Sequence, residues 1–160
     1  MAYRCIPIDT IAAERFRATG RDDAGGTLRR VTVKRVPGGG TYPCRHCLAP
    51  AEDGSEVLLG SFSLARPKGA YWTPSPVFVH ADACPRFDES GALPAFMRRI
   101  PLSIRAYDAA DQMLYDLSDA IPGAEADALI ERALGDARTQ YANIHTARFG
   151  CYLCRVERAS

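Results

Sequence analysis

The alternation of apolar and polar positions predicts a chain that is mostly β-strand. β-Branched residues alternating with polar ones, or short apolar runs bounded by turn-forming residues, are typical of strands. A β-hairpin is expected from residues 100–108 and 112–117, with its turn at 108–111. Five further strands are expected at residues 28–36, 56–64, 76–80, 141–147 and 151–157.

Two helices are expected among these strands. The first covers residues 9–19, with the aspartate at its first position as N-cap and Gly20 as a stop signal. The second covers residues 122–134, with Pro122 in its first turn and Gly135 at the C′ position. One face of this second helix is apolar: Ala126, Leu129, Ile130, Ala133 and Leu134.

These elements predict an α+β fold with two helices and a mostly antiparallel or mixed β-sheet. No internal repeat, low-complexity tract or linker interrupts the pattern, so a single domain is expected over residues 1–160. The composition agrees, since 47% hydrophobic and 24% charged residues are ordinary for one globular domain of 160 residues. The patterns do not determine the order of the strands.

Charge excludes some classes of function. Twenty Lys and Arg against nineteen Asp and Glu give a net charge of +1, which does not support a polybasic nucleic-acid or membrane binder. No apolar run approaches the roughly 20 residues of a membrane span, and the first nine residues do not resemble a signal peptide. A cytoplasmic location without a membrane partner is therefore expected.

Two basic groups are interpreted as solvated surfaces, and nucleic-acid binding is not expected of them. They lack interleaved aromatic residues on which bases could stack. The groups are Arg29, Arg30, Lys34 and Arg35 on one predicted strand, and Arg148, Arg155 and Arg158 near the C-terminus.

Five of the six cysteines lie in motifs. Two C-x2-C pairs and one H-x3-C element stand out, and only Cys5 is isolated. In a reducing compartment such cysteines bind metal or do redox chemistry more often than they form disulfides. Zinc takes four ligands, usually thiolate sulfur or imidazole nitrogen. One zinc ion is thus expected to use four of six candidates: Cys44, Cys47, His80, Cys84, Cys151 and Cys154.

Three quartets are compatible with these motifs. The first joins the two C-x2-C pairs, and the second joins the first pair to the H-x3-C element. The third takes one cysteine from each pair together with the H-x3-C element. A disulfide between Cys44 and Cys151 is also open if both thiols lie on one face of the sheet.

Other roles for these side chains are less favoured. C-R-H-C has the spacing of a dithiol oxidoreductase, but it precedes a turn and not the helix that would activate its first cysteine. His80 and Cys84 could act as base and nucleophile, although a ligand role is the simpler interpretation. His46 is expected to face solvent, and His145 to be a hydrogen-bonded histidine within a sheet.

Four motifs are shared with a known family. They are Y-P-C-R-H-C-L at 42–48, E-V-L-L at 56–59, P-V-F-V-H at 76–80 and G-C-Y-L-C-R-V-E-R at 150–158. With these motifs the chain resembles the domain-of-unknown-function 1203 family over nearly its full length. The resemblance implies a small, single-domain, cytosolic bacterial protein, and it implies no activity.

The favoured function is a binding module without catalysis, stapled by zinc, that takes a protein or small-molecule partner. A thiolate-rich ligand set is typical of structural zinc. The alternative is a zinc- or cysteine-dependent enzyme, a hydrolase or a redox protein. A catalytic ion keeps a position open for water and usually has a carboxylate nearby. Asp82 and Glu157 are the carboxylates nearest to the candidate ligands in the sequence.

Overall fold

The computed structural model describes residues 2–35, 41–89 and 92–159, and within it the chain forms two compact units. Each unit is assembled from separate stretches of sequence, because the chain changes unit after Ile6, Ser63, Thr73 and Phe87. Unit 1 contains residues 1–6, 64–73 and 88–160, and unit 2 contains residues 7–63 and 74–87.

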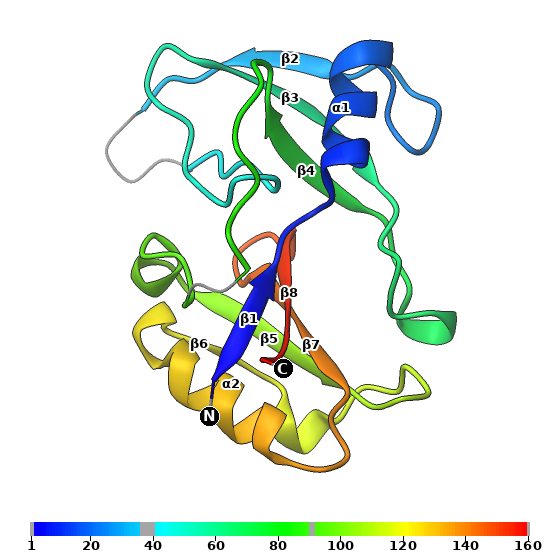
Figure 1. The fold of residues 1–160 in the computed structure, drawn as a ribbon, viewed down its shortest axis with the longest axis vertical. Coiled ribbons are helices and arrows are strands. Elements are labelled where there is room, and N and C mark those ends of the chain that lie inside the picture. Colours follow the sequence, from blue (N-terminus) through cyan, green and yellow to red (C-terminus); the bar gives the residue numbers. More distant parts are fainter. Residues whose placement is uncertain (1, 36–40, 90–91, 160) are drawn as a thin grey trace. The chain divides into compact units, whose positions relative to one another are not determined.

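Unit 1 contains a five-stranded antiparallel sheet in the order β1-β8-β7-β5-β6 (Figure 1). The strands predicted at residues 141–147 and 151–157 are confirmed as β7 and β8, and the structure pairs them with each other. The strands are β1 (Tyr3–Ile6), β5 (Leu102–Tyr107), β6 (Asp119–Ile121), β7 (Tyr141–Thr146) and β8 (Tyr152–Arg158).

Helix α2 (Ala126–Gly135) packs against β5, β7 and β8. All five apolar residues predicted to share a face are buried. The predicted start is different, because a 3-10 turn at Gly123–Glu125 precedes the α-helix. Gly135 is the last helical residue and not the C′ residue, and the Arg158 side chain caps this end by donating to Leu134 O at 2.8 Å.

The predicted hairpin is wrong in its second strand. Residues 112–117 form an isolated bridge from Met113 to Tyr107 and then a 3-10 turn at Tyr115–Leu117. The Ser118 hydroxyl accepts the Ala106 N–H at 2.9 Å, which removes that donor from strand pairing. The strand that pairs with β5 on the side opposite β7 is therefore β6, which follows this turn.

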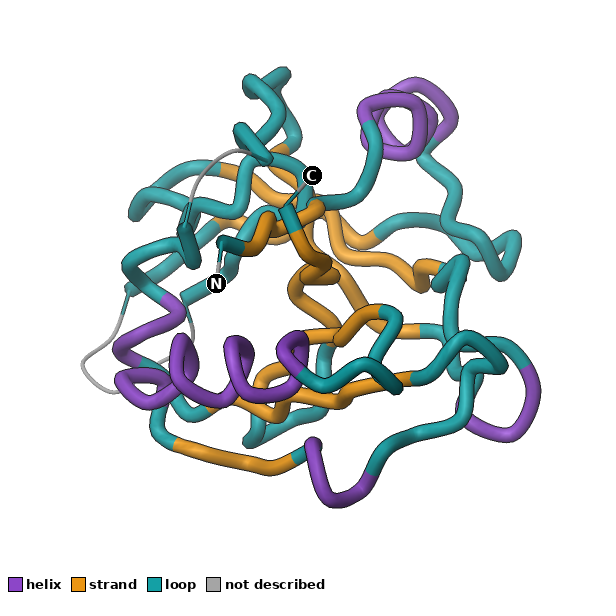
Figure 2. Tube along the Cα trace, turned by 60° about the horizontal axis from the view of Figure 1, so that its bottom comes forward, coloured by secondary structure: helices purple, strands orange, loops and turns teal. Residues whose placement is uncertain are grey.

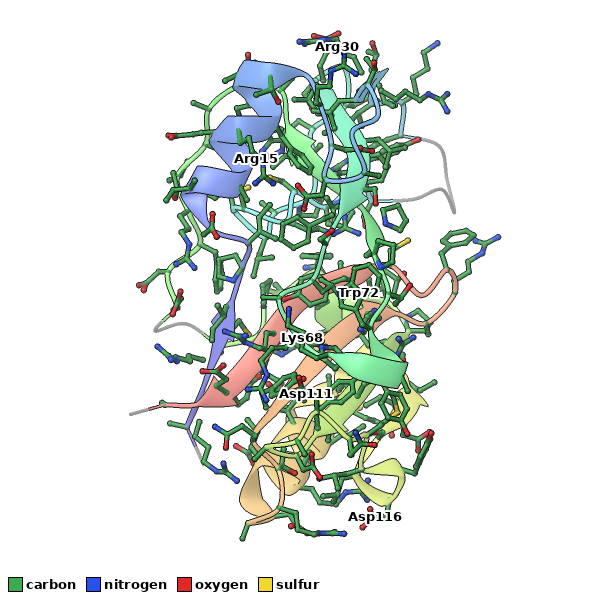
Figure 3. All side chains as sticks on the ribbon, turned by 90° about the vertical axis from the view of Figure 1, so that its right-hand side faces the viewer. Arg15, Arg30, Lys68, Trp72, Asp111 and Asp116 are labelled. Carbon is green, nitrogen blue, oxygen red and sulfur yellow. The ribbon has the colours of Figure 1, made fainter. Side chains whose placement is uncertain are left out.

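A buried carboxylate organises one side of unit 1. Asp111, at φ 62°, is 7% exposed and accepts hydrogen bonds from Arg66, Tyr141 and the Lys68 N–H. Figure 3 labels Asp111 and Lys68 in this region. Burial raises the pKa of Asp111, but these hydrogen bonds outweigh burial and hold the pKa below its usual value. The Arg66 guanidinium also lies 4.5 Å from the centre of the Tyr141 ring.

Unit 2 contains a three-stranded antiparallel sheet in the order β2-β3-β4 and one helix, α1 (Thr10–Thr19). The predicted ends of the helix are confirmed. The Asp9 side chain accepts the Ala12 N–H at 2.6 Å, and Gly20 ends the helix in the left-handed conformation at φ 64°. The strands are β2 (Arg29–Thr32), β3 (Glu56–Phe62) and β4 (Ser75–His80).

Both faces of this small sheet are covered. Phe16 of α1 meets Phe62 of β3 in an edge-to-face contact, with ring centroids 6.5 Å apart. On the other face, Val33 and Val57 form a small core with residues of the 42–51 segment. β2 is shorter than predicted, because its partner strand begins at Glu56, and position 36 of that prediction lies outside the described residues.

Long loops join the helices and strands in both units (Figure 2). Within the described part of the chain, no helix combines the length and the hydropathy that crossing a bilayer requires.

Candidate metal centre

The first C-x2-C pair lies in a tight turn that is held against β4. Cys44 forms a parallel bridge with Phe78, and the Arg45 N–H donates to Phe78 O at 2.9 Å. The turn closes through a 2.9 Å bond from the Leu48 N–H to Cys44 O, and Leu48 takes a positive φ of 50°. The prediction that C-R-H-C forms a turn and does not start a helix is confirmed.

The H-x3-C element adds two side chains beside this turn. His80 is the last residue of β4, and Cys84 lies in the loop that follows. Two main-chain bonds hold the loop, since the Ala81 N–H donates to Glu56 O at 2.9 Å and the Phe87 N–H donates to His46 O at 3.0 Å. A tight loop therefore brings Cys84 back toward His80.

Cys44, Cys47, His80 and Cys84 bring their ligand atoms within 4.8 Å of one another. The Cys44 and Cys84 sulfurs are 3.9 Å apart, and the Cys47 sulfur is 3.5 Å from His80 Nδ1. For a tetrahedral ion with bonds of about 2.3 Å to sulfur and 2.05 Å to nitrogen, the sulfur–sulfur distance is about 3.8 Å and the sulfur–nitrogen distance about 3.55 Å. Both distances agree with the spacing around one tetrahedral ion. This cluster could hold a metal ion.

The three thiols of the cluster differ in pKa, because a negative charge on Cys44 disfavours ionisation of the other two. The pKa of Cys44 falls to about 4, because hydrogen bonds to its sulfur outweigh burial. The donors are the Cys47 side chain and the main-chain N–H groups of Cys47, His80 and His46. The same contact with Cys44 and burial raise the pKa of Cys47, and burial followed by the charge on Cys44 raises the pKa of Cys84. A metal cation bound between the three sulfurs would favour their ionisation.

Three groups around the cluster hydrogen-bond its sulfurs. The His80 N–H donates to the Cys44 sulfur at 3.3 Å. Arg17 of α1 donates through Nη2 to the Cys84 sulfur at 3.4 Å and through Nε to His80 O at 3.0 Å. Partners of this kind orient metal ligands and tune their basicity.

The third group is His46, and the prediction that it faces solvent is wrong. It is 2% exposed, with Nδ1 3.3 Å from the Cys84 sulfur and Nε2 3.0 Å from Thr10 Oγ1. Burial lowers the pKa of His46, so a neutral ring that donates through Nδ1 and accepts through Nε2 satisfies both contacts. Sequence reasoning missed His46 and Arg17 because neither occupies a ligand position of the motifs, and their contacts with Cys84 are tertiary.

The structure brings together the second of the three predicted quartets. Cys151 and Cys154 belong to unit 1. Cys154 is buried within β8, and Cys151 is the residue directly before that strand. Across residues 2–35, 41–89 and 92–159, the one group of metal-ligating atoms does not include them. No disulfide joins any of the six cysteines, all of which lie among the described residues, so Cys44 and Cys151 are not paired. His145 is a hydrogen-bonded sheet histidine as predicted, with Nδ1 2.9 Å from Gly150 O.

The two carboxylates considered for catalysis lie in different surroundings. Asp82 lines an open cavity of about 300 Å³ next to His80, together with Glu52 and Glu56. Glu157 lies in β8 of unit 1, where Arg4 pairs with it at 3.1 Å. Neither carboxylate belongs to the group of ligand atoms found in the described residues.

A family described as "Protein of unknown function (DUF1203)" matches residues 41–158. The chain belongs to this family. The match covers all four clustered ligands and leaves out α1, which supplies Arg17 and Thr10. No curated protein and no solved structure matches the chain.

Proposed function

We propose that Cys44, Cys47, His80 and Cys84 hold one structural zinc ion, and that unit 2 is a binding module without catalysis at the metal. The spacing of the four ligand atoms supports this, because 3.9 Å between two sulfurs and 3.5 Å between a sulfur and a nitrogen are the edges of a zinc tetrahedron. Three sulfurs and one nitrogen favour zinc over the harder cations, which prefer oxygen ligands.

A structural role follows from the number and type of ligands. Four protein ligands fill a tetrahedral shell, whereas catalytic zinc keeps one position for water. Three thiolates and one imidazole around Zn²⁺ carry a net charge of −1, which Arg17 offsets through its hydrogen bond to the Cys84 sulfur.

The ion would join three separate parts of unit 2. The ligands come from the turn at Cys44 and Cys47, the end of β4 and the loop at Cys84. A three-stranded sheet with one helix has only a small core, and small domains commonly depend on a metal for stability. Structural zinc contributes on the order of 10 kcal/mol to folding in zinc-finger peptides.

Substitution of single ligands tests this proposal. Cys47→Ser and Cys84→Ser should each lose zinc and lower the melting temperature, whereas Cys151→Ser, a matched change outside the cluster, should keep one zinc per chain. A strong chelator should destabilise the unsubstituted protein and the Cys151→Ser control alike. Full zinc content and unchanged melting in Cys47→Ser and Cys84→Ser would show that these cysteines are not ligands.

The contact between His46 and Cys84 favours a second candidate, a cysteine-dependent enzyme. A histidine nitrogen 3.3 Å from a thiol, with its other nitrogen held by Thr10, is the arrangement of a base beside a nucleophile. Iodoacetamide distinguishes the candidates. If zinc binds Cys84, alkylation should be slow until a chelator is added. Rapid alkylation of Cys84 with zinc retained would favour the enzyme.

We also infer that the protein works in a reducing compartment such as the cytoplasm. The six free thiols support this setting, because an oxidising compartment would drive closely spaced cysteines toward disulfides. The partner of the module is a protein or a small molecule, and its chemistry is developed below.

A further inference from the structure

The two edges of the three-stranded sheet in unit 2 differ in their covering. The C-x2-C turn covers the β4 edge, through the bridge between Cys44 and Phe78 and the hydrogen bond from the Arg45 N–H to Phe78 O. β2 forms the other edge, and three of its four residues are exposed. An uncovered strand edge presents main-chain donors and acceptors to which another strand can pair.

The hydrogen-bonding pattern identifies the free main-chain groups of β2 and its extension. Val33 bonds toward β3, since its N–H donates to Ser55 O at 2.8 Å and its O accepts the Gly54 N–H at 2.9 Å. Main-chain groups alternate between the two sides of an antiparallel strand. The N–H and C=O groups of Arg30, Thr32 and Lys34 therefore point outward, and within the described residues no hydrogen bond uses them.

The side chains along this edge also alternate. Arg30, Thr32 and Lys34 are exposed, whereas Val31 is half-buried and Val33 is buried against the small core. Figure 3 labels Arg30 at the margin of its unit. Arg30 pairs with Glu56 at 2.7 Å, but both side chains are about half exposed, and such surface pairs contribute little to stability. No ion pair engages Lys34 within the described residues.

Charge selects the kind of strand that could pair here. An antiparallel partner places its side chains directly opposite those of β2, where like charges repel and opposite charges attract. A second copy of this edge would set Arg30 and Lys34 against the same basic residues, so the charges disfavour self-pairing. An acidic segment would instead form ion pairs while taking up the free main-chain groups.

We propose that the edge formed by residues 30–34 binds an extended acidic segment of a partner protein as an added strand. The segment carries carboxylates opposite Arg30 and Lys34, and apolar residues opposite Val31 and Val33. Main-chain hydrogen bonds provide the affinity, and alternate side chains provide the specificity. This inference rests on the proposed function in that it names the partner of the binding module, but it does not use the zinc ion.

The test uses the full chain and the probe acetyl-Glu-Val-Glu-Val-Glu-amide. In the free protein the amides of Arg30, Thr32 and Lys34 should exchange quickly with solvent, and saturating peptide should slow all three. The amides of Val31 and Val33 should be protected with or without peptide. The same peptide with Lys in place of Glu should not bind. Absence of added protection at the three outward amides would overturn the proposal.

Two changes at Thr32 separate strand pairing from other binding. Thr32→Pro removes an outward N–H that has no hydrogen-bond partner among the described residues, and an edge strand tolerates proline at such a position. It should weaken the peptide Kd at least about tenfold, whereas Thr32→Val should leave it unchanged. Lys34→Glu should weaken binding in the same direction and keeps the test valid if Thr32→Pro fails to fold.

Three outcomes complete the test. Equal affinity of the probe for Thr32→Pro and Thr32→Val would overturn the proposal. A dimer that forms without peptide and is lost in Thr32→Pro would also overturn it, by assigning the edge to a second copy of the chain. Zinc content measured on the same samples separates the two proposals. If the protein binds the peptide but holds no zinc, only the proposed structural zinc site is refuted.

Discussion

His46→Phe tests the link between a buried histidine and the candidate metal centre. Phenylalanine keeps a planar ring in this 2% exposed position but removes both ring nitrogens. The variant therefore loses the contact from Nδ1 to the Cys84 sulfur at 3.3 Å and the contact from Nε2 to Thr10 Oγ1 at 3.0 Å. These two losses have different consequences.

Loss of the contact with Cys84 should weaken zinc binding. A hydrogen bond to a charged acceptor contributes about 1.5–3 kcal/mol, which is about tenfold to a hundredfold in Kd. It is strongest when Cys84 is a thiolate, the form that binds metal. The bond with Thr10 joins two neutral groups whether or not metal is bound. Its loss should lower the free energy of unfolding by about 1 kcal/mol and leave zinc affinity nearly unchanged.

Competition with a chromogenic chelator measures the zinc affinity of His46→Phe and of the control Thr10→Val. His46→Phe should bind one zinc per chain with a Kd about tenfold to a hundredfold weaker, as expected when an outer partner of a ligand is removed. Thr10→Val should stay within about threefold of the unsubstituted chain. Equal affinities in all three proteins would refute a role of His46 in the metal centre.

Three further predictions concern charge and close packing. Arg17→Lys should weaken zinc binding, because the donors of lysine all lie on one nitrogen, whereas the guanidinium reaches Cys84 and the main chain from two separate nitrogens; chelator competition measures this. Asp111→Asn should lower the free energy of unfolding at pH 7. The difference in unfolding free energy between the two proteins should shrink as the pH falls from about 4 through the lowered pKa of Asp111 in the folded protein. The carboxyl group adds this stability only while it is ionised, and denaturant titrations at several pH values check this. Gly123→Ala should destabilise unit 1 by about 3 kcal/mol or more in thermal unfolding, because the new Cβ would overlap two main-chain oxygens that cannot move aside.

Local patterns were sufficient to predict most of the elements. The apolar face of α2 and the ends of α1 follow from residues within each helix, and both are confirmed. The hairpin partner of β5 was misplaced because the choice depends on a contact outside the local pattern, the hydrogen bond from the Ala106 N–H to the Ser118 hydroxyl. The order of the strands and the two discontinuous units depend on long-range pairing, which local periodicity does not contain.

The candidate site was predicted in part for a similar reason. Ligand spacing identified Cys44, Cys47, His80 and Cys84, but it gave equal standing to Cys151 and Cys154, whose spacing is the same. Sequence spacing does not show which motif β4 brings beside the first turn. His46 was assigned to solvent because it lies between two ligands of a turn, whereas the structure buries it in contact with Thr10 of α1 and with Cys84.

X-ray absorption spectroscopy at the zinc edge tests the central claim most directly, on protein purified without a metal-affinity tag and shown to hold one zinc per chain. The account predicts a shell of three sulfurs at about 2.3 Å and one nitrogen at about 2.0 Å, with no oxygen ligand. Cys84→Ser should purify without the ion and give no zinc signal, whereas Cys151→Ser should keep zinc with all three sulfurs. Four sulfurs, or a shell with an oxygen from water, would contradict the structural site formed by Cys44, Cys47, His80 and Cys84.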